Sequence, residues 1–382
     1  MKTYGRFPIA IAKGKGSYVW DDKGKQYLDY TSGIATCNLG HVPEQVKVAL
    51  EEQLDTLWHC SNLYHIPVQE QLATILTENS SLDAVFFCNS GAEANEAAIK
   101  IAKKYAKDQG NEERTEIVTF TNSFHGRTGT TLAATAQEKI HQGFTPIAPG
   151  FRYLPFNDYD ALSVVANGKT TAVLLELVQG EGGVNTAEKS WIKQLESVCQ
   201  SNDILLMIDE IQTGIGRTGT LYAYEQFDIE PDVISLAKGL GSGFPIGAML
   251  AKKAVAASFT PGTHGSTFGG NPLAATAGYT TVKTILEEDI LVHVENVTAL
   301  FLDKLSDLQK RYPAIESIKG KGLLIGLEMK GGAADYMTAL REKGVLVLLA
   351  GEAVLRLLPP LTTSEKEIND FINLFEEVLE EK

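Results

Sequence analysis

Between residues 84 and 251, short apolar runs alternate with segments that carry apolar side chains at helical spacing. The clearest pair is AVFFC at 84–88 followed by GAEANEAAIKIAKKYAKD at 91–108. Apolar runs without polar alternation are typical of parallel strands that are buried on both faces by crossover helices. The pattern therefore predicts an α/β fold around a mostly parallel sheet. Its further strands are predicted at 115–120, 171–178, 204–209, 232–237 and 247–251.

The pattern changes after about residue 270, where a smaller α+β domain is expected. The first 40 residues contain turns and strand-like pieces, are too few to fold alone, and are expected to dock on that domain. No linker rich in Ser, Pro or Gly interrupts the chain. We therefore predict an N-terminal segment at 1–45, a large domain at 46–270 and a small domain at 271–382. The small domain is predicted to hold helices at 272–288, 292–311 and 364–381, and strands at 323–328, 345–348 and 354–358.

Composition narrows the classes of partner. The 34 Lys and Arg residues against 48 Asp and Glu residues give a formal charge of −14, which disfavours nucleic acid. The longest apolar runs, at 204–208 and 345–350, fall well short of the roughly 20 residues of a membrane helix. The N-terminal sequence lacks the apolar core of a signal peptide, and the four cysteines form no CxxC motif. We expect a cytoplasmic protein with free thiols, no membrane span and no nucleic-acid partner.

Polar groups follow four of the predicted strands, where ligands bind in open parallel sheets. Small residues at 89–92 open a helix, an arrangement that suits an anion, although an ordinary helix cap would look the same. The segment 122–128 contains an aromatic ring, an imidazole and a guanidinium. These groups indicate either a binding cluster or an ordinary turn. Asp209 ends an apolar strand, where an acid is costly unless it is paired. Lys238 lies between a predicted strand and a glycine loop. Its position fits either a desolvated, nucleophilic amine or an ordinary surface lysine. Together, these four groups at strand ends favour a ligand-binding site at this edge of the sheet.

Competing motifs fit poorly. The segment 163–170 resembles a phosphate-binding loop of an NTPase but lacks its first glycine and precedes a strand. The GxGxxG match at 214–219 begins five residues after Asp209 and opens no clear helix, which disfavours a dinucleotide-binding dehydrogenase. There is no GxSxG or HExxH motif, and the seven histidines lack metal-ligand spacing.

Several motifs together resemble one family. They include DEIQTGIGRTG at 209–219, AKGLGSGFPIGA at 237–248 and HGSTFGGNPLA at 264–274. In these motifs the chain is similar to the class III, ω-amino-acid-type aminotransferases of fold type I, which depend on pyridoxal 5′-phosphate (PLP). One departure is Glu176-Leu177, where many relatives have Glu-Pro. The resemblance implies a large domain with a mostly parallel seven-stranded sheet, a small α+β domain, and a homodimer with active sites at its interface.

The resemblance also implies cofactor-binding roles. Lys238 would bond covalently to the PLP aldehyde and later move the proton, while Asp209 would keep the ring nitrogen protonated. Phe124 and Ile211 would cover the two faces of the ring, and Gln212 would bond its phenolic oxygen. The phosphate would be bound by Ser90, Gly91 and Ala92, and by Thr267 of the neighbouring subunit; Glu210 completes the expected cofactor set.

Substrate-binding roles follow from the same resemblance. Arg127 and Ser266 would bind the amino donor, Glu181 would neutralise Arg356 until that arginine binds 2-oxoglutarate, and Tyr4 would lie near the substrate mouth. His125 is expected behind the site. Ile34 is expected where ornithine-using members carry a tyrosine.

The motifs are most like those of members that use N2-acetylornithine and 2-oxoglutarate in arginine biosynthesis. Ornithine δ-, succinylated-donor, 4-aminobutyrate and lysine-type transamination remain alternatives, as does a non-catalytic metabolite-binding protein.

Overall fold

The computed structural model describes residues 1–382 and is built around a seven-stranded sheet. Four neighbouring pairs are parallel, and only β12 runs antiparallel to both of its neighbours. The predicted α/β class with a mostly parallel seven-stranded sheet is confirmed. The strand order is β4 (Ala84–Cys88), β12 (Gly247–Ala251), β11 (Val233–Leu236), β10 (Leu205–Asp209), β7 (Thr170–Leu175), β5 (Glu116–Phe120) and β6 (Phe151–Leu154).

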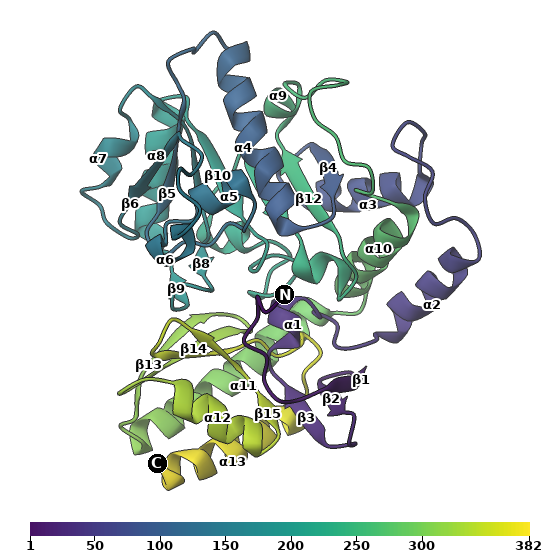
Figure 1. Ribbon diagram of the computed structural model, residues 1–382, viewed down its shortest axis with the longest axis vertical. Coiled ribbons are helices and arrows are strands. Elements are labelled where there is room, and N and C mark those ends of the chain that lie inside the picture. Colours follow the sequence, from purple (N-terminus) through teal and green to yellow (C-terminus); the bar gives the residue numbers. More distant parts are fainter.

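Helices cover both faces of this sheet (Figure 1). They include α4 (Gly91–Asp108), which packs on one face, and α8 (Lys189–Ser201), which packs on the other. The other elements of this part are α2 (Glu44–Leu54), α3 (Pro67–Glu78), α5 (Gly129–Ala134), α6 (Glu138–His141), α7 (Leu162–Val165), α9 (Lys253–Ala256), α10 (Pro272–Glu287), the hairpin β8 (Val178–Gln179) and β9 (Asn185–Thr186), and the 3₁₀ helices η1 (Ala223–Phe227) and η2 (Lys238–Gly241).

The continuous apolar runs are explained by this two-sided burial. Successive strand side chains point to opposite faces, so Leu174 and Met207 join the cluster under α4. Their neighbours Leu175 and Ile208 join the larger cluster on the other face. Strands β7, β10, β11 and β12 are buried at every position, which leaves only their ends for polar chemistry.

The C-terminal part holds an antiparallel sheet with the order β13-β14-β17-β16. The N-terminal strands form a separate sheet, in which β3 pairs in parallel with β15. Figure 1 accordingly shows the purple N-terminal strands beside the yellow-green C-terminal elements. These elements are β1 (Ile11–Lys15), β2 (Tyr18–Asp21), β3 (Gln26–Asp29), α1 (Ser32–Ala35), α11 (Ile290–Arg311), β13 (Ile315–Lys321), β14 (Leu324–Met329), α12 (Ala334–Glu342), β15 (Val345–Leu346), β16 (Leu348–Ala350), β17 (Val354–Leu357) and α13 (Glu365–Glu381).

The structure differs from the sequence-based expectations at several strands. The run predicted at 171–178 breaks at Glu176, where the chain leaves the sheet before the short β8. The run predicted at 345–348 divides between two sheets, because β15 pairs with β3 and β16 pairs with β17. Strands β6 and β13 were not predicted, since both lie at sheet edges and lack a continuous apolar run.

An ion pair ties the N-terminal segment together. His41 Nε2 lies 2.8 Å from Asp29 Oδ2, at the end of β3. This hydrogen bond raises the pKa of His41 to about 10. Because the folded-state pKa lies above the ordinary value, the pair stabilises the fold fully below about pH 6.5 and is lost as pH rises through about 10.

We therefore predict that His41→Asn lowers the free energy of unfolding by roughly 1–3 kcal/mol at pH 6, and by much less at pH 10. Thermal unfolding of wild type and variant at pH 6, 8 and 10 measures the difference. If the difference in free energy of unfolding between wild type and His41→Asn stays constant or grows as pH rises, the charged pair is not its cause.

Candidate active site

A cavity of about 470 Å³ lies at the carboxyl ends of the central strands. Each of the four strand-end groups expected from the sequence contributes to its lining, namely Ser90 after β4, Phe124 and His125 after β5, Asp209 at the end of β10 and Lys238 after β11. Because these ends meet at one edge of the sheet, residues far apart in sequence share one site. The other predicted residues in the lining are Gly91, Ala92, Arg127, Glu181, Ile211 and Gln212.

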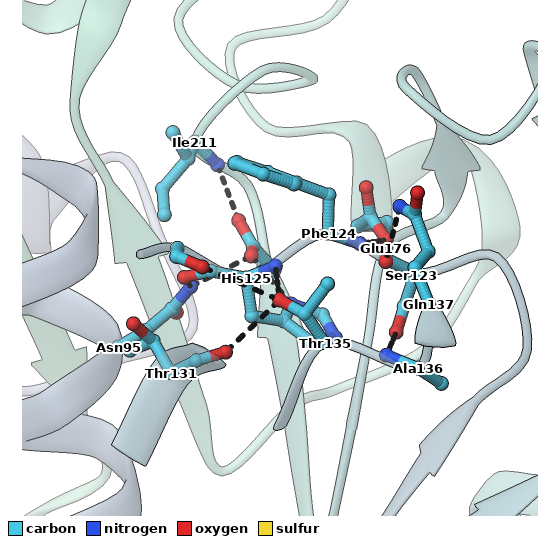
Figure 2. Close-up of polar contacts among 12 residues, drawn as sticks. Asn95, Ser123, Phe124, His125, Thr131, Thr135, Ala136, Gln137, Glu176 and Ile211 are labelled. Atoms are coloured by element: carbon cyan, nitrogen blue, oxygen red, sulfur yellow. Dashed lines mark hydrogen bonds and ion pairs between the residues drawn. The ribbon is translucent and has the colours of Figure 1, made fainter. Parts of the chain in front are cut away.

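Asp209 is a buried carboxylate with three N–H donors. Asn95 Nδ2 and His125 Nδ1 each lie 2.8 Å from its Oδ2, and the amide of Ile211 donates to Oδ1 at 3.1 Å. Figure 2 shows Asn95, His125 and Ile211 converging from separate segments. Donors of this kind offset the loss of water around a buried anion. Asp209 can therefore face a cationic group in the cavity without a protein cation of its own.

Lys238 lies in the same cavity, and its side-chain amine makes no hydrogen bond. Burial lowers the pKa of Lys238 to about 8, and the Arg356 charge acts in the same direction. At pH 7 about a tenth of the amine is therefore in the neutral, nucleophilic form, far more than for an ordinary lysine.

The backbone at Lys238 is held in an uncommon conformation. Its φ of 42° is left-handed, which is costly for a residue with a side chain. A Cβ at Gly239 would stand 2.1 Å from Asn38 Nδ2, so only glycine lets the Asn38 amide pack here. Asn38 is in turn fixed by bonds to Ile215 O at 2.7 Å and from Arg217 Nη2 at 2.8 Å.

An anion-binding terminus forms the opposite wall. Ser90 caps the 18-residue helix α4, and its hydroxyl accepts the amide of Glu93 at 3.2 Å. A Cβ on Gly91 would approach the Ile211 side chain to 2.8 Å, so the close helix–strand packing requires glycine. The remaining amides of this first turn and the helix dipole favour a phosphate.

Two apolar side chains, Phe124 and Ile211, line the cavity. Figure 2 shows the Phe124 ring extending toward Ile211. Apolar side chains of this kind suit a planar aromatic ring, and the buried carboxylate of Asp209 suits a protonated nitrogen in such a ring.

Glu181 and Arg356 form an ion pair, with Glu181 Oε1 2.7 Å from Arg356 Nη1. The same guanidinium nitrogen donates to Gly180 O at 2.8 Å and to Gln212 Oε1 at 3.3 Å. Burial alone would raise the pKa of Glu181, but the charge and hydrogen bond of Arg356 lower it below its usual value.

One expected cofactor residue, Glu210, does not line the cavity. Its carboxylate accepts from Thr213 Oγ1 at 2.7 Å, Ala223 N at 3.1 Å and Tyr224 N at 2.8 Å. Since adjacent residues at a strand end point in opposite directions, Asp209 faces the cavity and Glu210 organises the loop behind it.

Five further residues do not line the cavity of their own chain. Arg356 is buried behind it and meets it through the ion pair with Glu181. Ser266 and Thr267 line a neighbouring cavity, where Ser266 Oγ accepts from Asn89 Nδ2 at 3.3 Å. Tyr4 is 75% exposed. Ile34 is 43% exposed, and Thr36, two residues on, lines the cavity instead.

Sequence reasoning missed Asn95 and Glu176. Asn95 is the buried polar residue on the otherwise alanine-rich inner face of α4, a signal that could have been noticed. Glu176 directly follows β7, and the prediction of one strand over 171–178 concealed that it ends at the cavity.

Comparison with known proteins gives the family. Residues 1–379 match the aminotransferase class-III family. The chain belongs to this family. Among curated relatives, it is 65% identical to an acetylornithine aminotransferase of Oceanobacillus iheyensis, over 99% of this chain and 95% of the relative.

Solved structures agree with this membership. An ornithine aminotransferase from Toxoplasma gondii, described with partial occupancy of PLP at its active site, is 32% identical with a TM-score of 0.95 and covers 99% of this chain and 91% of its own. An N-acetylornithine aminotransferase from Stenotrophomonas maltophilia is 36% identical with a TM-score of 0.87, over 99% of this chain and 97% of its own.

The cofactor of this class-III aminotransferase is PLP, and the cavity fits it. The buried anion of Asp209 suits the ring nitrogen, the apolar side chains of Phe124 and Ile211 suit the ring, and the α4 terminus suits the phosphate. When bound, PLP supplies an aldehyde for the amino group and a protonated ring that accepts electrons. None of the helices has the length and apolar character of a membrane-spanning segment.

We predict that Lys238→Ala abolishes turnover, at least a thousandfold, while the fold persists, because no other amine lines the cavity. Borohydride reduction of the wild-type holoenzyme followed by peptide mapping should place the label on Lys238. A label on another lysine would refute the assignment.

Proposed function

We propose that this aminotransferase transfers the δ-amino group of N2-acetyl-L-ornithine to 2-oxoglutarate in arginine biosynthesis. The products are N-acetyl-L-glutamate 5-semialdehyde and L-glutamate. The 65% identity to a curated acetylornithine aminotransferase over nearly the whole chain carries the proposal. We also place the enzyme in the cytoplasm, where its four free cysteines would remain reduced.

The Glu181–Arg356 pair explains how one cavity takes two substrates in turn. With the pair closed at 2.7 Å, Arg356 is neutralised and a donor enters with its distal amine toward Lys238. When Glu181 moves aside, Arg356 is available for the α-carboxylate of 2-oxoglutarate. In either half of the cycle, Lys238 Nζ removes the proton from the carbon that carries the transferred amino group.

Arg127 offers a second carboxylate site at the exposed side of the cavity. Its guanidinium lies 5.6 Å from the centre of the Phe124 ring and makes no ion pair. The α-carboxylate of the donor can therefore bind there in bidentate fashion.

The same site disfavours free ornithine. Its α-ammonium would stand beside the Arg127 cation, whereas the acidic groups Glu176 and Asp209 are buried and the partly exposed Glu181 is already paired with Arg356. A neutral acetamide avoids this repulsion and the cost of an unpaired ammonium.

We predict that kcat/KM for N2-acetylornithine exceeds that for ornithine by at least tenfold, about 1.4 kcal/mol of discrimination. Initial rates with a panel of acetylated, succinylated and free ω-amino donors measure it. Ornithine used equally well or better would overturn the proposed donor.

We further propose that the enzyme is a homodimer in which Thr267 reaches the phosphate site of the partner subunit. The support is an exposed apolar patch beside Thr267, in which the Phe268 and His59 rings lie 5.1 Å apart. Exposed apolar side chains that gather on one surface are typical of an interface. The patch comprises Leu57, Trp58, Leu63, Tyr64 and Phe268.

Thr267→Ala should weaken PLP binding roughly tenfold, because one hydroxyl donor to the phosphate is lost. Thr362→Ala, at an exposed threonine without a side-chain hydrogen bond, is the matched control. Equilibrium dialysis and sedimentation measure affinity and assembly. A fully active monomer, or unchanged affinity in Thr267→Ala, would contradict the proposal.

A further inference from the structure

Glu176 is a second carboxyl group beside Asp209. It directly follows β7, whose last residue, Leu175, pairs with Ile208 of β10, so Glu176 and Asp209 extend from neighbouring strands. Both line the cavity, and Glu176 is only 8% exposed. The steps of the proposed transamination reaction do not assign a role to Glu176.

The contacts of Glu176 differ sharply from those of Glu181. Glu176 Oε2 accepts the backbone amide of Phe124 at 3.0 Å, and no cation lies within ion-pair distance of either oxygen. Glu181, five residues later, has Arg356 at 2.7 Å. Figure 2 shows Glu176 against the Phe124 backbone, on the far side of the ring from Ile211.

The surrounding charges oppose a third anion. Asp209 from β10 and Glu181 from the loop after β8 both repel a negative charge on Glu176, while the charge of Lys238 after β11 acts in the opposite direction. Asp209 already takes the donors Asn95 and His125. Burial, followed by the Asp209 charge, raises the pKa of Glu176 well above its usual value. Two neighbouring carboxyl groups commonly resolve such a conflict by ionising unequally.

We propose that Glu176 works as a neutral carboxylic acid that positions Phe124, accepting its amide through one oxygen and donating an O–H hydrogen bond into the cofactor cavity through the other. The neutral form leaves each remaining anion of the interior with a cationic partner, since Glu181 is paired with Arg356 and Asp209 would face the protonated cofactor ring. An ionised Glu176 would repel the anionic cofactor and the carboxylates of both substrates. The inference rests on the PLP site, but it does not depend on which donor is used.

Infrared difference spectroscopy of the holoenzyme tests the protonation state directly. Near neutral pH, subtracting Glu176→Gln from wild type should leave the carbonyl-stretch band of a protonated carboxyl group, which disappears as pH rises. The matched control is Glu181→Gln, whose difference spectrum should instead show carboxylate bands. Carboxylate bands from Glu176 at neutral pH would overturn the proposal.

Cofactor affinity gives a second, independent readout. Glutamine preserves the size, the neutral charge and the acceptor for Phe124, so Glu176→Gln should bind PLP at least tenfold more tightly than Glu176→Ala. Wild-type affinity should fall as pH rises through the Glu176 titration, and that fall should be absent in Glu176→Gln. Equal losses in the two variants, or the same pH dependence in wild type and Glu176→Gln, would show that a carboxylate is required.

Discussion

A buried carboxylate at the end of a fully apolar strand is the constraint on which the site depends. Asp209 has left water, so its charge must be offset by donors that the fold supplies. Asn95 comes from α4, His125 from the loop after β5, and Ile211 from the chain just beyond β10. Helix α4 thus has two roles, because its first turn offers the amides that we expect to bind the phosphate and its inner face orients Asp209. The relative position of ring and phosphate sites is fixed by one rigid element.

Four acidic residues around the cavity show how environment assigns chemistry. Glu181 is paired with Arg356 and stays ionised, while Glu176 has only an amide and two negative neighbours. Glu210 is buried behind the cavity, where desolvation raises its pKa to about 7 despite three donors. Asp209 is the anion that faces the ring. The four side chains are chemically alike, so residue type alone does not show which of them is ionised. Hydrogen-bond partners, neighbouring charges and burial determine the pKa of each carboxyl group.

The sequence predicted the sheet and the groups at its strand ends, because burial on both faces leaves a clear apolar signal and polar residues stand out after it. It did not predict β6 or β13, whose edge positions tolerate polar residues. It did not show that Glu210 points away from the cavity or that Glu176 lines it, since the direction of a side chain at a strand end depends on where the strand stops. It also overlooked Asn95, which lies on the inner face of α4. Ser266 and Thr267 lie outside the cavity of their own chain, so the role proposed for them requires a second subunit.

The central claim is that Asp209 is an anion that holds a proton on the cofactor ring. Nitrogen-15 NMR of the holoenzyme with labelled PLP tests it most directly, since the ring-nitrogen shift reports protonation. The account predicts a protonated nitrogen at neutral pH in the wild type and its loss in Asp209→Ala, with PLP still bound through Lys238. An unprotonated ring nitrogen in the wild type, or the same protonated state in both proteins, would contradict it.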